Sequence, residues 1–182
     1  MRDHDMWRIG LIILIFISQG AQADKNNAAA ASGQMQFQGE VIADTCIIDD
    51  GNQYLTVDMG QASNSKFKQA GDDSDPVMFS LNFRHCSPNV SRNMVVAFRG
   101  VADKQNPDLL AIETGDNDAR GIGIALFDDK GNLIPINTGK LVVKPKYAGP
   151  LTVNLTARYR STTDNVSGGI ANAQAWFLFT YQ

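Results

Sequence analysis

The amino-acid sequence predicts one all-β domain, folded as a two-sheet sandwich, behind an export signal. Three observations favour this fold class. Apolar and polar side chains alternate with a period of two along most of the chain, which is typical of half-buried strands. Patterns that start helices are few. The chain behind the signal has the length of one domain and shows neither a repeat nor an interdomain linker, so we expect a single core.

The first residues have the pattern of a secretory signal. Residues 9–17 form an apolar run that is too short to span a bilayer, and residues 21–23 (Ala-Gln-Ala) offer the small side chains that a signal peptidase accepts. We therefore expect residues 1–23 to be a signal peptide, with a short membrane anchor as the alternative. Two aspartates lie before the run, where a net positive charge is expected, so Met6 competes with Met1 as the start of translation.

The strands follow from the apolar pattern. Two runs are joined by a polar link that contains glycine, residues 128–132, and this link predicts a hairpin. The expected strands, in chain order, are residues 55–59, 77–83, 94–98, 122–127, 133–136, 153–159 and 173–181.

Segments between the strands have the composition of turns. Residues 106–110 predict one short helical turn with Pro107 at its first position, and residues 71–76 and 162–169 predict loops. Many short strands with few helices indicate a sandwich of the immunoglobulin-like type.

The two cysteines, Cys46 and Cys86, are expected to form a disulfide, because an exported protein enters an oxidising compartment. A metal pair or a redox dithiol is the weaker alternative. There is no Cys-x-x-Cys motif, and His85 is the only histidine behind the signal.

Composition argues against several other classes of function. The formal charge of -3 and the pI near 5.2 disfavour a nucleic-acid partner, which usually meets a basic face. Residues 121–123 lack the third glycine of a nucleotide-binding fingerprint, and residues 128–131 lack the spaced ligands of a calcium loop. A single mature histidine makes a catalytic triad improbable. We therefore expect no catalytic residues, no cofactor and no metal, and we do not expect an enzyme.

Both ends of the mature chain have unusual strand patterns. Residues 173–181 are apolar on both faces, as expected for a strand that is covered on both sides, and a central strand is the simple alternative. Residues 24–38 alternate small or apolar side chains with polar ones. They form either a disordered tail or a strand that pairs with the exposed sheet edge of another chain. The same-parity residues of these two segments are Ala173, Ala175, Phe177, Phe179 and Tyr181 in the first, and Ala29, Ala31, Gly33, Met35 and Phe37 in the second.

Several of these residues carry a family resemblance. Residues 37–46 (FQGEVIADTC), the second cysteine in residues 83–86, Gly169, and the ending at residues 177–182 resemble the pilins of the chaperone–usher pathway. Gly169 and the penultimate Tyr181 match that family's C-terminal motif. Within the family, the chain most resembles the minor, FimI-like subunits of type 1 fimbriae.

The resemblance implies an incomplete immunoglobulin-like sandwich that lacks its last strand. A periplasmic pilus chaperone lends the missing strand, and at the outer-membrane usher the N-terminal extension of the next fimbrial subunit replaces it. The implied division is a signal at 1–23, a donor-strand extension at 24–38 and a pilin domain at 39–182. Gly33 is expected where the receiving pocket has no room for a side chain. The groove and the chaperone-recognition surface are expected to involve Gly169, Phe177, Phe179, Tyr181 and Gln182.

The resemblance also implies a place and a role. The chain would pass through the periplasm to the fimbrium on the bacterial cell surface, as a structural subunit that contributes to cell adhesion. An assembly-terminating or regulatory subunit is the first alternative. A tip adhesin is the second, but it would need an additional lectin domain for which the chain has no spare length.

Overall fold

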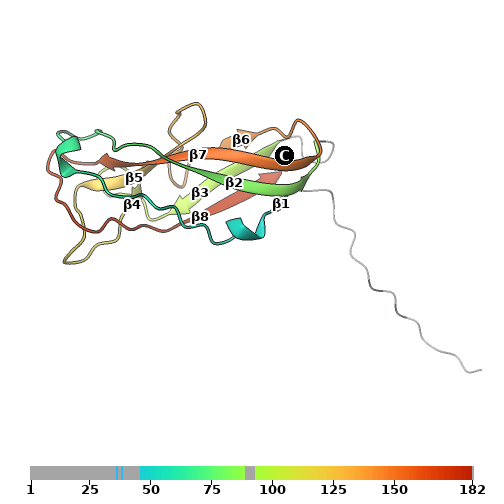
Figure 1. Cartoon of the computed structure of the whole chain (residues 1–182), viewed down its shortest axis with the longest axis horizontal. Coiled ribbons are helices and arrows are strands. Elements are labelled where there is room, and N and C mark those ends of the chain that lie inside the picture. Colours follow the sequence, from blue (N-terminus) through green and yellow to red (C-terminus); the bar gives the residue numbers. More distant parts are fainter. Residues whose placement is uncertain (1–35, 37, 39–45, 89–92, 182) are drawn as a thin grey trace, which may run out of the picture. The chain divides into compact units, whose positions relative to one another are not determined.

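The computed structural model describes residues 36, 38, 46–88 and 93–181. All described strands and short helices belong to one compact unit, Val41–Gln182, and the strands form a sandwich of two antiparallel sheets (Figure 1). In the described part of the chain, no helix is long and apolar enough to cross a membrane. The elements are β1 (Ile47–Ile48), η1 (Asp50–Asn52), η2 (Asn64–Lys66), β2 (Val77–Cys86), β3 (Met94–Gly100), β4 (Leu110–Ala111), β5 (Ile122–Phe127), β6 (Leu141–Val143), β7 (Gly149–Ser161) and β8 (Ala175–Tyr181).

The larger sheet has five strands in the order β1-β2-β7-β5-β4. Its centre is the pairing of the two longest strands, β2 and β7, in which Leu81 lies opposite Val153 and Phe79 opposite Leu155. These four side chains share the inward parity of the two strands, as the sequence predicts. β5 pairs with the other edge of β7, and its six residues are all buried.

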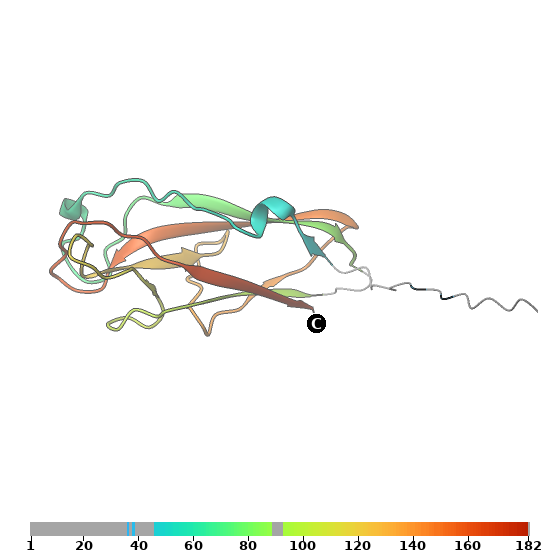
Figure 2. The same ribbon diagram turned by 90° about the horizontal axis from the view of Figure 1, so that it is seen from below.

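The smaller sheet has three strands in the order β6-β3-β8. Met94 of β3 lies between Val143 of β6 and Tyr181 of β8, and at the other end Gly100 lies opposite Ala175. Seen from below, β8 lies in the layer opposite β7, with the core between the two layers (Figure 2). The core combines large side chains of both sheets, including Leu81, Phe83, Leu155, Met94, Val96 and Phe98.

A second small cluster lies on the outer side of β5. Leu109, Ala125 and Phe127 are buried there, with Leu133 packed against them. Arg160 places its guanidinium over the ring of Phe127, 5.2 Å from the ring centroid, and so covers the same face.

Two predicted elements form only in part. The link after β5 does turn, because Asp128 accepts hydrogen bonds from the backbone of Lys130 and Asn132. Its second arm, residues 133–136, makes an isolated bridge rather than a strand. Pro135 explains this, since it has no backbone N–H for a ladder. Residues 106–109 form a turn instead of a helix, in which the backbone N–H of Leu109 donates to the carbonyl of Asn106 at 3.0 Å, and Leu110 begins β4.

Candidate functional site: a groove beside the last strand

The last strand, β8, has a strand neighbour on one edge only. Within the described residues it pairs with β3, and no strand lies along its other edge. Phe177, Phe179 and Tyr181 face the core and are half-buried, whereas Trp176 and Leu178 face outward and are exposed. The parity expected from the sequence is therefore correct, but the outward apolar face has no cover in this part of the chain.

A groove of about 1080 Å³ opens along the free edge of β8. One wall is the segment from Ala171 to Phe177, and the opposite wall is the segment from Gln53 to Gly60. The floor is the sandwich core itself, because the lining includes side chains of both sheets: Phe79, Leu81, Phe98, Leu110, Ile124, Leu126, Ala157 and Tyr159. The groove therefore reaches down to core side chains beside the first residues of β8.

The wall opposite β8 corrects one prediction. A strand is expected at 55–59, yet these residues form no strand in the structure. The cause is the absence of a partner, since a strand is stabilised by a neighbour that accepts and donates its backbone hydrogen bonds. The side chains from Thr56 onward still alternate: Val57 and Met59 are half-buried, while Thr56 and Asp58 are exposed. This wall has the side-chain pattern of a strand without the pairing.

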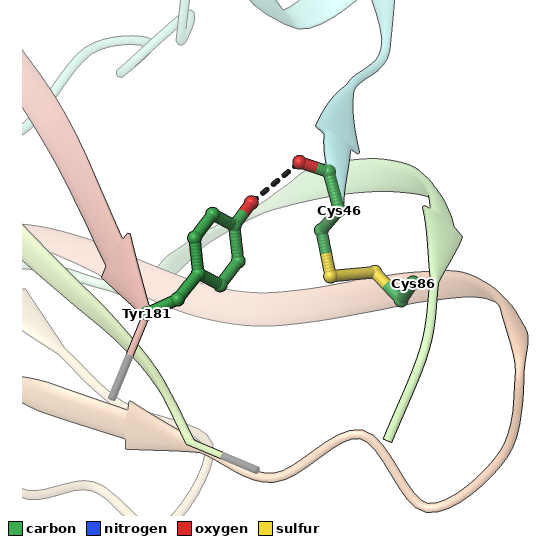
Figure 3. Close-up of a disulfide and its surroundings, with 3 residues drawn as sticks. All are labelled: Cys46, Cys86 and Tyr181. Carbon is green, nitrogen blue, oxygen red and sulfur yellow. Dashed lines mark hydrogen bonds between the residues drawn. A yellow bond between two sulfur atoms is a disulfide. The ribbon is translucent and has the colours of Figure 1, made fainter. Parts of the chain in front are cut away.

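The groove is closed at the Tyr181 end by aromatic packing and by the disulfide. The Phe179 ring packs edge to face against two rings, with centroid-to-centroid distances of 5.3 Å to Phe83 and 6.0 Å to Tyr181. The Tyr181 hydroxyl donates a hydrogen bond to the backbone carbonyl of Cys46, and Cys46 is bonded to Cys86 (Figure 3). The predicted disulfide is therefore confirmed. Burial of the phenol raises the pKa of Tyr181.

Gly169 lies beyond the other end of the groove. A side chain at this position would meet the backbone of residues 117–119, with Ala119 N only 2.4 Å from an added Cβ. Gly169 does not line the larger groove. It lines a smaller cavity of about 400 Å³ that adjoins the groove at Ala171 and Tyr159. The packing requirement explains why glycine stands here, independently of any partner.

Tyr159 is a site residue that the sequence identifies only as part of a strand. It lines both cavities, and its hydroxyl donates to the backbone carbonyl of Ala171 at 3.1 Å, which fixes the approach to β8. Burial, and the negative charge of Asp58 across the groove, raise the pKa of Tyr159. Glu113 is a second such residue. It lines the groove, and its carboxylate accepts a hydrogen bond from Gln174 at 3.3 Å.

The remaining predicted site residues cannot be placed. The expected donor residues Ala29, Ala31, Gly33, Met35 and Phe37, together with Gln182, lie outside the described residues. Among the described residues, no group of three or more histidine, cysteine or acidic side chains could hold a metal ion. The groove thus offers an apolar floor and one free strand edge. This arrangement suits the binding of an extended peptide segment, which adds a strand to the sheet and buries alternate side chains.

Comparison with known proteins points to one family. A family model described as "Fimbrial protein" matches residues 35–182. The chain is 30% identical over 183 residues to the "Fimbrial subunit type 1" of Salmonella typhimurium, which covers 98% of this chain and 99% of that protein. It is 35% identical over 152 residues to the "Putative fimbrin-like protein FimI" of Salmonella typhi, covering 82% of this chain and 85% of that protein.

The fold has a counterpart among solved structures. A chain in the structure of a chaperone–usher pilus, solved to explain how the rod uncoils, superposes with a TM-score of 0.64. The match covers 84% of this chain and 97% of that chain at 23% sequence identity. At this identity, the likeness shows the fold alone.

Proposed function

This chain belongs to the family of fimbrial proteins, and we propose that it is a minor structural subunit of a type 1-like fimbria whose groove is filled by a strand from another protein. The observation that carries the proposal is the groove, which has a free edge of β8 on one side and core side chains as its floor. Fimbrial subunits are structural proteins, so family membership agrees with the expectation that the chain is not an enzyme.

Strand addition explains how such a groove would bind its partner. An extended segment along β8 would pair with its unpaired backbone groups, and every second side chain would point into the groove. Each large apolar side chain that becomes fully buried contributes about 1.5–3 kcal/mol. Without a donor, the open groove and the free strand edge favour aggregation, so the subunit needs a partner from the moment of export.

Two donors act in succession in this proposal. A periplasmic chaperone supplies the first strand and holds the C-terminal carboxylate of Gln182 with basic side chains. At the outer-membrane usher, the N-terminal segment of the next subunit replaces the chaperone strand. The bond from Tyr181 to Cys46 supports this scheme, because it fixes the position of the residue before the C-terminus.

The chain's own donor is residues 24–38 in the proposal. Its small and apolar positions would fill the groove of a neighbouring subunit, with Gly33 at a place that has no room for a side chain. Residues 28–31 are all alanine and offer little apolar bulk, so the contact should be weaker at that end of the donor.

The minor role is the finer part of the proposal. Identity to the FimI-like relative, 35%, is only slightly above the 30% to a type 1 fimbrial subunit. Copy number in isolated fibres therefore tests this part: a major subunit would be the dominant protein. A terminating subunit would differ in a second way, since donor peptides would fail to displace the chaperone from its groove.

Family membership supports a place for this chain in a surface fibre. Fimbrial subunits form surface fibres, and we propose that this chain reaches the fibre through the periplasm, after cleavage behind residue 23, and contributes to cell adhesion there. The disulfide Cys46–Cys86 supports passage through an oxidising compartment.

Deletions at the two ends test the groove directly. Removal of Tyr181 and Gln182 should give an exported subunit that is degraded or aggregates in the periplasm, because β8 can no longer hold the chaperone strand. Removal of residues 26–37 should instead leave a stable chaperone complex that cannot join a fibre. Periplasmic fractions, analysed for soluble complex and for fibres, separate the two results. A purified chain that is monomeric and fully stable without chaperone or added peptide would contradict the proposal.

Glycine substitutions test how the donor is aligned. Gly33→Leu should block insertion into a neighbour while leaving the subunit's own fold and its chaperone complex unchanged. Gly39 shares the parity of Gly33, so Gly39→Leu is the matched comparison. Donor exchange is followed with a purified acceptor and synthetic donor peptides. If the Gly33→Leu peptide exchanges normally and the Gly39→Leu peptide fails, then Gly39 and not Gly33 occupies the position of the groove that has no room for a side chain.

A further inference from the structure

The outer face of the three-stranded sheet differs in composition from the rest of this acidic chain. Its outward side chains include Trp176, Leu178 and Val142, with exposed fractions of 67%, 47% and 54%. Strands β3, β6 and β8 contain no aspartate or glutamate. An exposed apolar surface whose strands carry cations and no acidic residue is a candidate for the binding of an anionic partner.

The pairing of the strands gathers these side chains into rows. Arg99 lies directly opposite Trp176, and Ala97 lies opposite Leu178. Directly opposed residues of an antiparallel pair have Cβ atoms about 4.5–5.5 Å apart. The guanidinium of Arg99 can therefore reach a group that rests on the Trp176 ring.

Two lysines extend the positive charge along the neighbouring strand. Lys140 and Lys144 flank β6, share the parity of the outward-facing Val142, and are exposed. Residues 139–148, which include β6, contain three lysines and no acidic residue. The charge of this segment is thus opposite in sign to that of the whole chain, which is -3.

These cations differ from Arg84 and Arg160 of the five-stranded sheet, which are paired with aspartates. Arg160 forms a bidentate pair with Asp73 at 2.6 and 2.7 Å, and Arg84 contacts Asp49 and Asp50. No ion pair among the described residues includes Arg99, Lys140 or Lys144.

We propose that the outer face of the β6-β3-β8 sheet binds an acidic polysaccharide. A sugar ring would stack on Trp176, and its sulfate or carboxylate would accept hydrogen bonds from Arg99. Lys140 and Lys144 would meet further acidic groups of the same polymer, since they lie about 13 Å apart along the strand direction. Clustered basic residues on an exported protein suit polyanions of the heparin type.

Protection of the sheet edge accounts for only part of this pattern. Lysine and proline commonly keep an edge strand from pairing with another chain, and β6 is an edge strand followed by Lys144 and Pro145. Protection of the β6 edge does not explain Trp176 and Arg99, because these residues lie on β8 and β3.

The test uses the exported chain, purified with the chaperone that accompanies it, and passed over dextran sulfate and over neutral dextran. Retention on dextran sulfate alone is expected. The double variant Lys140→Gln/Lys144→Gln should lower the affinity about three- to tenfold, as the loss of two exposed ion pairs would. Trp176→Leu keeps an apolar side chain but removes the stacking ring, and it should weaken binding without changing the dependence on salt.

The matched control is Lys68→Gln/Lys104→Gln, which removes the same charge from exposed loops outside this sheet. It should leave retention unchanged. Equal loss in both double variants would overturn the proposal, because binding would then reflect net charge alone. The proposal also fails if dextran sulfate retains all variants normally. If those variants also alter fibre assembly, the face is a contact between subunits instead. The four lysines of these variants do not line the groove, which the end deletions test separately.

Discussion

The two sheets of this sandwich differ in whether an edge strand has partners for its backbone. At the edge of β2, the short strand β1 pairs with two residues, and the side chain of Asn52 then continues the ladder. Its amide nitrogen donates to the Ser80 carbonyl at 3.3 Å, and its amide oxygen accepts from the Asn82 backbone at 2.9 Å. At the edge of β8, no described strand or side-chain amide takes this place.

This difference shows that a strand of two residues and one buried side chain together can close part of a strand edge. Asn52 is only 6% exposed, and it satisfies two backbone groups that would otherwise lack partners. An open edge is an aggregation hazard, so the retention of one beside the groove is consistent with use by a partner strand.

Loss of the disulfide should have the largest effect on the closed side. Cys46→Ser/Cys86→Ser removes a cross-link over a sequence separation of 40 residues. In the chain-entropy model, this lowers the free energy of unfolding by about 4 kcal/mol. Denaturant unfolding of the peptide-complemented subunit measures it. Free-thiol labelling of the wild-type periplasmic protein is the companion measurement and should find neither cysteine. Labelling of both cysteines would contradict the prediction that the disulfide forms in the exported protein.

Asn52→Ala should open the closed edge. The variant leaves two backbone groups of β2 without their partner, at a cost of about 1–3 kcal/mol in the free energy of unfolding. Asn82→Ala is the control. Its amide oxygen accepts one exposed hydrogen bond from Thr152 at 2.9 Å, and its loss should cost about 1 kcal/mol or less. Equal effects of the two substitutions would show that the edge is not closed by Asn52.

Tyr181→Phe should give the smallest change. It removes one hydrogen bond to Cys46, worth about 0.5–1.5 kcal/mol, at the end where the groove is closed. Burial raises the pKa of Tyr181 in the folded state, so the neutral phenol stabilises the fold. That contribution is complete below the unfolded pKa of about 10 and is lost as the pH rises through the folded value.

The pH dependence provides the measurement. Unfolding midpoints at pH 8 and at pH 11 should differ less in the Tyr181→Phe variant than in the wild type. Tyr159 has a raised pKa as well, so part of the alkaline loss should remain. A variant that keeps the full alkaline loss would show that Tyr181 does not contribute to it.

The sequence predicts the elements that hold one another in place. Strands β2, β3, β5 and β7 are found where alternation or apolar runs place them, since buried faces select side chains residue by residue. The strand at 55–59 is absent because pairing depends on a neighbour as well as on pattern. Tyr159 and Glu113 reach the groove through the topology of the sheets, which no local pattern encodes. Gly169 is recognisable as a motif residue, but its contact with residues 117–119 is visible only in three dimensions.

The disulfide also determines how a fibre of such subunits would carry mechanical load. If residues 24–38 are anchored in a neighbour, tension enters this subunit at Cys46. The first strand beyond it, β1, has only two residues and would peel away under force. The covalent bond to Cys86 transfers the load instead to the end of β2, which is ten residues long and paired with β7. Pulling would therefore shear a long ladder rather than unzip a short one, so the bond acts as a mechanical bypass around the weakest strand.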